Sequence, residues 1–361
     1  MAEKKNDTDA LSEKDGVNNP PKHLSEKAAT AIKQKRKQVV SIESLVGELT
    51  SGNTTALSKA ITLIESEAKQ HQHISKTLLQ QCLQHTVPSF RIGITGVPGV
   101  GKSTFIERFG THLTQNGHRV AVLAVDPSST VSRGSILGDK TRMEALVKDS
   151  NAYIRPSSSG SSLGGVARKT REAIILCEAA GFETIIIETV GVGQSETAVH
   201  SMTDFFLLLK LAGAGDELQG MKRGIMEMAD AIVINKADGD NIKAAKLART
   251  EFNRALHLFP PKESQWAPKA MTCSALNNEG IDAVWKSLQE YLEIVKDNGY
   301  FSEKRKQQNR FWLLQTIENT LQQQFFNRPD IQKAFEEQLK KIHQQETTPF
   351  EAAEYLLSMA T

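Results

Sequence analysis

The sequence predicts an α/β fold in which a mostly parallel sheet is flanked by helices. Strand-like and helix-like segments alternate between residues 90 and 300, which is the pattern of a parallel sheet wrapped by helices. Within that region the stretch GVPGVGKST, residues 96–104, fits the P-loop pattern G-x-x-x-x-G-K-[ST]. It lies between an apolar run and a helical pattern, as the motif requires. The expected fold class is therefore a P-loop NTPase with helical segments at both ends.

The composition of the chain is that of a globular protein. Of its 361 residues, 39% are hydrophobic and 24% are charged, and the net charge of +2 gives no reason to expect nucleic acid or a membrane surface as the main partner. Cys82, Cys177 and Cys273 lie far apart, so we expect buried reduced thiols rather than disulfides or a zinc ribbon. Neither a secretory or transit signal nor a bilayer-spanning run is recognised, and a cytoplasmic location is expected.

Four regions are expected along the chain. They are a disordered tail, N-terminal helices, the α/β domain and a C-terminal helical extension, at residues 1–22, 23–88, 89–300 and 301–361. The tail is polar and cannot bury enough apolar surface to offset the cost of ordering. In the second region, apolar residues recur at helical spacing over 41–84, with breaks at 51–53 and near His71.

Seven strands are expected in the α/β domain. They are placed at residues 90–95, 119–125, 152–155, 184–188, 204–209, 231–235 and 269–273. Right-handed crossovers between parallel strands bring the P-loop to the carboxyl edge of the sheet. Ligand-binding residues are therefore expected at strand ends.

The P-loop residues have separate expected roles. Its glycines let successive backbone N–H groups turn inward around a phosphate at a helix N-terminus. Lys102 reaches the β- and γ-phosphates, Ser103 ligates Mg²⁺, and Thr104 donates to the α-phosphate. The phosphate-binding residues expected are Gly96, Val97, Pro98, Gly99, Val100, Gly101, Lys102, Ser103 and Thr104.

Two carboxylates follow apolar strand-like runs, Asp126 in AVDPSST and Glu188 in IIIETVGVGQ. A carboxylate at such a position is costly unless it meets a cation. Glu188 occupies the place of the Walker B acid, which holds Mg²⁺ or its water, and Gly191 offers a backbone N–H that can sense a γ-phosphate. A structural carboxylate is the alternative at both positions.

The tetrapeptide NKAD, residues 235–238, fits the N-K-x-D pattern of guanine readers. Its carboxylate accepts from the N1–H and the exocyclic amine of guanine, while the lysine stem covers the base. Adenine offers no such donor pair, and a mismatch of this kind is worth about 10⁴- to 10⁵-fold in discrimination. The sequence TCSA, residues 272–275, fits the last guanine loop. The base-site residues expected are Asn235, Lys236, Asp238, Ser274, Ala275 and Leu276.

At these residues the chain resembles the methylmalonyl-CoA mutase-associated GTPases, the MeaB/ArgK type in the G3E group of SIMIBI-class GTPases. The resemblance covers residues 40–350, and several of its strings are more specific than a general GTPase motif. It rests on six strings. These are GVPGVGKST, AVDPSST, GSILGDKTRM, ETVGVGQSE, GAGDELQGMKRG and NKAD.

The resemblance implies three switch loops, at residues 126–142, 188–194 and 212–222. It also implies that the magnesium ligands are Ser103, Asp126, Asp139 and Glu188. The catalytic candidates are Lys102, Glu188, Gln194, Gln219 and Lys222. Lys210 and Ala212 depart from the usual pattern, which bears on loop stiffness more than on chemistry.

The C-terminal section resembles the dimerisation extension of that family. A helical stripe of Phe311, Leu314, Ile317 and Leu321 lies beyond the α/β domain and needs something to cover it. Packing back onto its own domain is one solution, and a two-fold exchange of arms is the one that the resemblance favours.

The function implied is that of a homodimeric GTPase whose nucleotide state gates adenosylcobalamin loading and protection of methylmalonyl-CoA mutase or a related mutase. Mg²⁺ and GTP or GDP are its expected ligands, and adenosylcobalamin enters only through the partner. The alternatives are a metal-insertion GTPase, a kinase for periplasmic amino-acid-binding proteins, and a non-enzymatic nucleotide-locked scaffold. The first is disfavoured because the chain has no clustered Cys or His, and nothing in the sequence resembles a site for a protein hydroxyl.

Overall fold

The computed structural model describes residues 41–66, 68–125, 143–156, 163–189, 195–213 and 223–359. Its centre is a seven-stranded sheet of order β3-β2-β4-β1-β5-β6-β7, in which every paired strand is parallel to its neighbour. The strands are β1 Phe90–Gly96, β2 Val120–Val125, β3 Ala152–Arg155, β4 Thr184–Thr189, β5 Phe205–Leu211, β6 Ala231–Asn235 and β7 Lys269–Thr272. All seven expected strands are therefore confirmed, with ends shifted by at most two residues.

The largest shift is in β5, which continues to Leu211 instead of ending at residue 209. The next residue after the expected end is Lys210, and a lysine is rarely fully buried. In the structure Lys210 is 1% exposed and pairs in register with Ile234 of β6.

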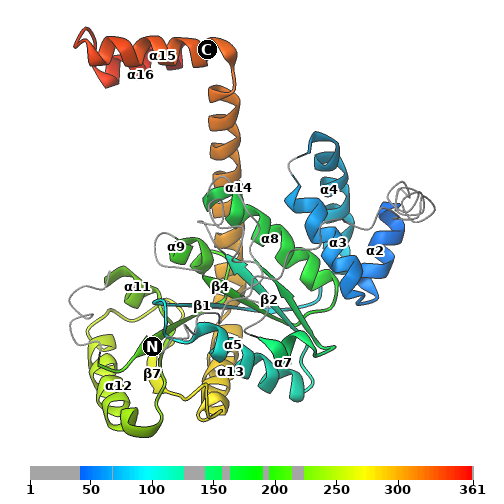
Figure 1. Ribbon diagram of the computed structural model, residues 1–361, viewed down its shortest axis with the longest axis vertical. Helices are drawn as coiled ribbons and strands as arrows, with labels where there is room; N and C mark the ends of the chain where they lie inside the picture. Colours follow the sequence, from blue (N-terminus) through cyan, green and yellow to red (C-terminus); the bar gives the residue numbers. More distant parts are fainter. Residues whose placement is uncertain are drawn as a thin grey trace, which may run out of the picture.

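Helices cover both faces of the sheet (Figure 1). Before and among the strands lie α2 Ile42–Thr50, α3 Thr54–Glu65, α4 Lys69–Cys82, the 3-10 turn Leu83–His85, α5 Lys102–Gln115, α7 Glu144–Val147, α8 Leu163–Ala179, α9 Ser195–His200 and α11 Arg223–Met228. After β6 come the 3-10 turn Gly239–Asn241, α12 Ile242–Leu256, α13 Ile281–Asp297, α14 Tyr300–Phe326, α15 Pro329–His343 and α16 Pro349–Ser358.

Alternate residues of the central strands face different cores. Ile185 and Ile187 of β4 pack with α8 and the N-terminal helices, whereas Ile186 packs with α5 and α13. A third cluster joins β5 and β6 to α12. Because a strand residue shares its face with the residue two positions away, this division places the P-loop helix α5 on one face and α8 and α9 on the other.

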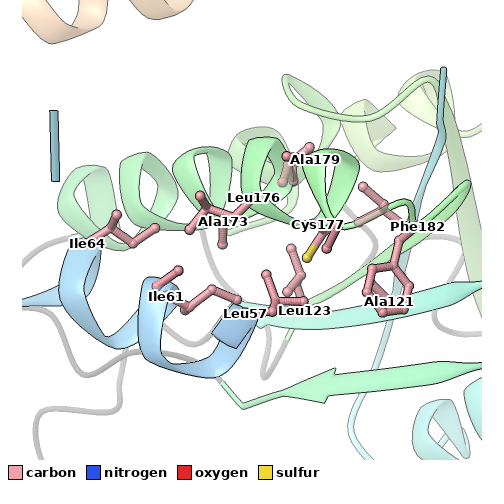
Figure 2. Close-up of a cluster of buried hydrophobic side chains, with 14 of the residues drawn as sticks. Leu57, Ile61, Ile64, Ala121, Leu123, Ala173, Leu176, Cys177, Ala179 and Phe182 are labelled. Atoms are coloured by element: carbon pink, nitrogen blue, oxygen red, sulfur yellow. The ribbon is translucent and has the colours of Figure 1, made fainter. Parts of the chain in front are cut away.

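The N-terminal helices are packed onto the sheet domain through α8 (Figure 2). Leu57, Ile61 and Ile64 of α3 are fully buried against α8, and the three cysteines of the chain are free and buried, as expected. The guanidinium of Arg119 donates to the carbonyls of Ala180 and, more weakly, Gly52. These contacts make the N-terminal helices part of the same body as the sheet.

The position predicted for the break between α3 and α4 is wrong by a few residues. The expected break near His71 lies instead between Glu65 and Lys69, and His71 is inside α4. Its ring Nδ1 lies 2.8 Å from Ser66 Oγ, so His71 contacts the turn from within the helix. The other expected break is confirmed, since Asn53 caps α3 by accepting from the N–H groups of Thr55 and Ala56.

Two buried aspartates fix the amino edge of the sheet. Asp204 precedes β5 and accepts from the N–H of Arg91 in β1 at 2.8 Å. Asp230 precedes β6 and accepts from the N–H of Phe206 in β5 at 3.0 Å, while Lys262 pairs with its other oxygen at 2.7 Å. Each carboxylate therefore satisfies the first free N–H of a neighbouring strand, at the edge opposite the P-loop.

The C-terminal helices form an arm. Helix α14 has 27 residues and rises out of the body, carrying α15 and α16 at its far end (Figure 1). On its outer part Phe311, Leu314 and Leu321 are 46%, 49% and 60% exposed. None of the helices in the described ranges is long and apolar enough to cross a membrane.

Candidate active site

The loop between β1 and α5 has the backbone that its glycines predict. Gly99 and Gly101 have φ values of 80° and 91°, in the left-handed region that favours glycine. A Cβ at Gly101 would lie 2.8 Å from the Asn235 side-chain nitrogen, and one at Gly96 would lie 2.6 Å from the Leu209 carbonyl oxygen. The loop therefore needs glycine both for its turn and for its close approach to the neighbouring strands.

Lys102 opens α5 directly after this loop. Its ammonium donates to the carbonyl oxygen of Gly96 at 2.7 Å and reaches that of Val97 at 3.5 Å. The lysine thus lies over the loop, at the N-terminus of a 14-residue helix where anions are favoured. Ser103 follows it in the first turn and is half-buried, while Thr104 is exposed.

The side chain of Asn235, at the end of β6, connects two loops. Its Nδ2 donates to the carbonyl oxygen of Val100 in the P-loop at 2.9 Å. Its Oδ1 accepts from the N–H of Ala275 at 3.1 Å and from the thiol of Cys273 at 3.4 Å. Because Asn235 is 1% exposed, these bonds are shielded from water. One carboxamide therefore holds the phosphate loop and the expected base loop together.

The carboxylate of Asp238 is also held by the last loop. Ser274 Oγ donates to Asp238 Oδ2 at 2.5 Å and accepts from the N–H of Asn277 at 3.1 Å. Asp238 is half-buried, and Lys236 beside it is exposed with φ at 58°. The N–H of Ala275 donates to Asn235. To bind a base carbonyl as well, this N–H must donate to both acceptors. Leu276, the last expected member of the base site, is 70% exposed.

Cys273 is a member of this cluster that sequence reasoning missed. Burial raises the pKa of its thiol to about 12, so the group stays protonated and acts as a donor to Asn235. Its position inside the predicted loop was the only available signal, because a buried cysteine carries no motif of its own.

Glu188 lies at the carboxyl end of β4, in register with Ile94 of β1, and is 5% exposed. Next to it, the hydroxyls of Thr189 and Thr95 are 2.9 Å apart and buried. The alternation of the strand places Glu188 on the α5 face and Thr189 on the α8 face. The carboxylate is therefore at the edge and on the face from which the P-loop helix begins, as the Walker B prediction requires.

The structure places the described candidate residues at one edge of the sheet. The P-loop follows β1, Glu188 ends β4, the NKAD residues follow β6 and the TCSA residues follow β7. Several expected residues lie outside the described ranges, and their roles stay predictions. They are Asp126, Asp139, Gly191, Gln194, Gln219 and Lys222.

Comparisons with known proteins show the family that the chain matches. The family model of the methylmalonyl-CoA mutase-associated GTPase MeaB matches residues 57–330. A putative GTPase of Caulobacter vibrioides is 49% identical over 317 residues, which cover 88% of this chain and 97% of that protein. GTPase ArgK of Escherichia coli is 43% identical over 304 residues, which cover 84% of this chain and 92% of ArgK.

One mitochondrial relative and one solved structure extend the comparison. The mouse methylmalonic aciduria type A homolog is 44% identical over 326 residues, covering 88% of this chain and 79% of the relative. The crystal structure of a LAO/AO transport system kinase is 36% identical with a TM-score of 0.73, and the match covers 90% of this chain and 98% of that one. The chain therefore belongs to the family of methylmalonyl-CoA mutase-associated GTPases, MeaB, and is a P-loop GTPase that binds GTP and GDP.

Proposed function

We propose that this GTPase is a chaperone whose nucleotide state gates adenosylcobalamin loading and protection of methylmalonyl-CoA mutase or a related mutase. The observation that carries the nucleotide part is the bridge made by Asn235, which ties the phosphate loop to the base loop. The client is supported by the family to which the chain belongs. Adenosylcobalamin enters through the client and is not assigned to residues of this chain.

The described residues support direct hydrolysis of GTP. A water oxygen attacks the γ-phosphorus in line, the bond from that phosphorus to the β–γ bridging oxygen breaks, and the water loses its proton to bulk solvent or to phosphate. Lys102, which lies over the loop carbonyls, stabilises the charge that develops on the phosphate oxygens. Asp238 selects guanine, and Asn235 keeps the base and phosphate subsites at a fixed separation.

The donor set at this edge fits Mg²⁺, which prefers oxygen ligands. Ser103 offers a hydroxyl in the first turn of α5, and Glu188 offers a buried carboxylate at the end of β4. When bound, the ion neutralises charge on the β- and γ-phosphates. Asp126 and Asp139 complete the proposed set and lie outside the described residues.

We propose that the protein acts as a homodimer joined through its arm. Phe311, Leu314, Ile317 and Leu321 recur at helical spacing on α14 and are 46%, 49%, 46% and 60% exposed. A contiguous apolar stripe of this kind is typical of an association surface. Changing Leu314 and Ile317 together to Glu should produce monomers in analytical ultracentrifugation, and Lys306→Glu should not. Dimers that survive the double change would contradict the arm interface.

The client is tested by binding and turnover measured together. Purified mutase is immobilised, and the protein is applied with Mg²⁺ and GDP, with a non-hydrolysable GTP analogue, or without nucleotide. We expect affinities that differ by about 5-fold or more between the two nucleotides, the usual size of an allosteric coupling. GTP hydrolysis should also be faster with mutase present. Lys102→Ala serves as the control that loses turnover. Equal binding in all three states, together with unchanged turnover, would contradict the proposal.

A second candidate is phosphoryl transfer to a protein, which is favoured by the similarity to the structure of a LAO/AO transport system kinase. Hydrolysis and transfer differ in where the γ-phosphate goes. With γ-labelled GTP and a periplasmic amino-acid-binding protein, the main proposal predicts free phosphate and no labelled protein. Labelled protein at a rate comparable to phosphate release would favour the kinase.

A further inference from the structure

Helix α9 lies between the nucleotide edge of the sheet and the arm. It begins at Ser195, directly after residues 188–194, the segment expected to respond to the γ-phosphate. Its body is packed onto the sheet, since Val199 is fully buried in the same cluster as Phe206 of β5. It ends at His200, and the chain continues through residues 201–204 into β5. Any shift at its start is therefore carried along a short, packed element to residues 201–204.

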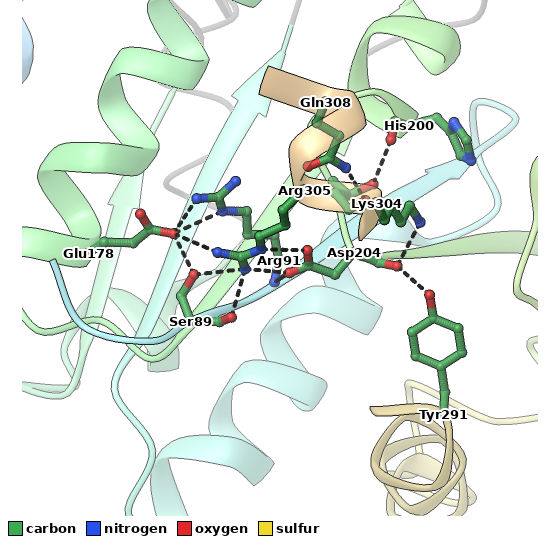
Figure 3. Close-up of polar contacts among 10 residues, drawn as sticks. Ser89, Arg91, Glu178, His200, Asp204, Tyr291, Lys304, Arg305 and Gln308 are labelled. Carbon is green, nitrogen blue, oxygen red and sulfur yellow. Dashed lines mark hydrogen bonds and ion pairs between the residues drawn. The ribbon is translucent and has the colours of Figure 1, made fainter. Parts of the chain in front are cut away.

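One face of α14 holds the segment that follows α9 (Figure 3). Lys304 Nζ donates to the carbonyl oxygen of Asp204 at 2.7 Å, and Gln308 Nε2 donates to that of Thr203 at 2.8 Å. One turn further on, Trp312 Nε1 donates to the carbonyl oxygen of Ser201 at 3.2 Å. The three donors are four residues apart in sequence, so they lie in a row on the helix. We call Lys304, Gln308 and Trp312 the foot of α14.

Buried ion pairs prevent the foot from sliding over this segment. Arg305 donates to both oxygens of Asp204, at 2.9 and 2.7 Å, and to the carbonyl oxygen of Ser89 at 2.8 Å. Arg91 in turn donates to Glu178 of α8 at 2.8 and 2.7 Å. Separating the partners of such a pair costs free energy, because it leaves a buried charge without a counter-charge or water. Residues 201–204 and the foot of α14 are therefore held to each other.

Helices α8, α9 and α14 each carry a buried polar atom that is unsatisfied among the described residues. Four buried side-chain atoms lack a hydrogen-bond partner within the described parts of the chain, and three of them are Arg171 Nη1 in α8, Ser195 Oγ in α9 and Gln308 Oε1 in α14. Arg171 also lies over the Trp312 ring, 5.4 Å from its centroid. Each unsatisfied buried group destabilises the arrangement that leaves it without a partner. An arrangement in which these atoms gain partners would compete with this one, which is what a two-state element requires.

We propose that α9 and the foot of α14 form a relay that links the nucleotide bound at the carboxyl edge to the orientation of the arm, with Gln308 as a positioning residue. The relay rests on the proposed function, because it requires residues 188–194 to respond to the γ-phosphate. Linkage makes it reciprocal: a nucleotide that shifts the arm has its own affinity changed when the foot is altered. The foot is therefore expected to set the preference for GTP over GDP without touching nucleotide.

The test compares Gln308→Met with Gln307→Met in the full chain. Methionine keeps the length of the side chain and removes the amide, and Gln307 is the exposed neighbour on the same helix. Trp312→Phe is the second variant, because it keeps an aromatic ring and removes the N–H donor together with the five-membered part of the indole. Titration with fluorescent GDP and with a non-hydrolysable GTP analogue gives the ratio of the two dissociation constants. Hydrogen exchange of residues 309–326 is then compared with each nucleotide bound.

We expect the Gln308→Met and Trp312→Phe proteins to change the affinity ratio by about 5-fold or more, and Gln307→Met to leave it within about 2-fold of wild type. Wild-type α14 should exchange at different rates with the two nucleotides, and this difference should shrink in Gln308→Met. Identical exchange in the wild-type protein, or equal ratios in all variants, overturns the relay while leaving the proposed function intact. Failure of the wild-type protein to bind the GTP analogue would contradict the proposed function itself, and the relay with it.

Discussion

Asn235 donates its side-chain amide to the carbonyl oxygen of Val100 at 2.9 Å, across the strand that separates β1 from β6. The guanine-reading motif is thereby fastened to the phosphate loop, and the distance between base and phosphates is set by the protein before ligand arrives. Preorganisation of this kind lowers the cost of binding.

Replacing Asn235 by Ala should weaken GDP binding and destabilise the protein. The change leaves the Val100 carbonyl and the Ala275 N–H without their partner in a buried site, at about 1–3 kcal/mol. Titration calorimetry with GDP should show a loss of about 10-fold or more, and urea unfolding should report the stability. Asn116→Ala, at an exposed residue with one local bond, is the control. GDP affinity within 2-fold of wild type would show that the bridge does not preorganise the site.

Gly99 and Gly101 should respond differently to replacement by Ala. Both have left-handed backbones, which costs any residue with a Cβ about 1–2 kcal/mol. At Gly99 the new Cβ meets nothing within 4 Å, but at Gly101 it meets the Asn235 side chain at 2.8 Å. Urea unfolding should therefore find Gly101→Ala the less stable protein by at least about 1 kcal/mol. Equal stability of the two variants would indicate that the Asn235 side chain can move away from the new Cβ without loss of stability.

The ion pair at the root of the arm should be among the most sensitive positions for stability. Asp204→Asn removes the charge that faces Arg305 and Lys304, and Asp204 is 1% exposed. We expect a loss of about 3–5 kcal/mol in the free energy of unfolding, the usual result of removing one partner of a buried pair. The exposed pair between Arg328 and Asp330 supplies the control, since water screens it and Asp330→Asn should cost far less than Asp204→Asn. Similar losses in both variants would contradict this assignment.

His200 should make the protein less stable as the pH falls below neutrality. Burial, and then the positive charge of Lys304, lower the pKa of His200 to about 4, while Asp230 opposes the shift. Between pH 6.5 and 4, His200 is protonated in the unfolded chain but stays neutral in the folded chain. The free energy of unfolding is therefore highest above pH 6.5 and decreases toward pH 4, by about 3 kcal/mol in total.

The test of this prediction is urea unfolding at several pH values. His200→Phe keeps the edge-to-face contact with Phe206 and should remove this part of the pH dependence. His257→Phe, at an exposed position, is the control. If the His200 variant keeps the acid sensitivity of the wild type, another group is responsible.

The sheet, and the edge of it that carries the candidate site, were predictable because local sequence patterns indicate both. Apolar runs such as 184–188 predict buried parallel strands, and the motifs place the P-loop, Glu188 and Asp238 at strand ends with fixed spacing. Both classes of signal depend only on neighbours in sequence.

The polar junction under the arm could not be predicted in the same way. Lys304, Arg305 and Gln308 look like the solvated face of a helix. Their partners, Asp204 for the first two and Thr203 for Gln308, lie about 100 residues earlier. Lys210 is a similar case, because a lysine inside a strand pattern predicts the end of the strand. A buried charge is stable only when tertiary structure brings partners to it. Patterns among neighbouring residues in the sequence do not indicate these partners.

The central claim is that this edge of the sheet reads guanine through Asp238 and hydrolyses the nucleotide that it reads. The most direct measurement is steady-state turnover of GTP and of xanthosine triphosphate by the wild type, by Asp238→Asn and by Asp240→Asn, whose exposed carboxylate lies two residues away. Xanthine replaces the guanine amine with a carbonyl, which the new amide can donate to. We expect Asp238→Asn to lose about 100-fold or more in kcat/KM for GTP and to gain activity with xanthosine triphosphate, since a site built for a hydrogen bond rejects a base that leaves it unpaired. Asp240→Asn should behave as wild type. Unchanged use of GTP by the Asp238→Asn protein would contradict the claim.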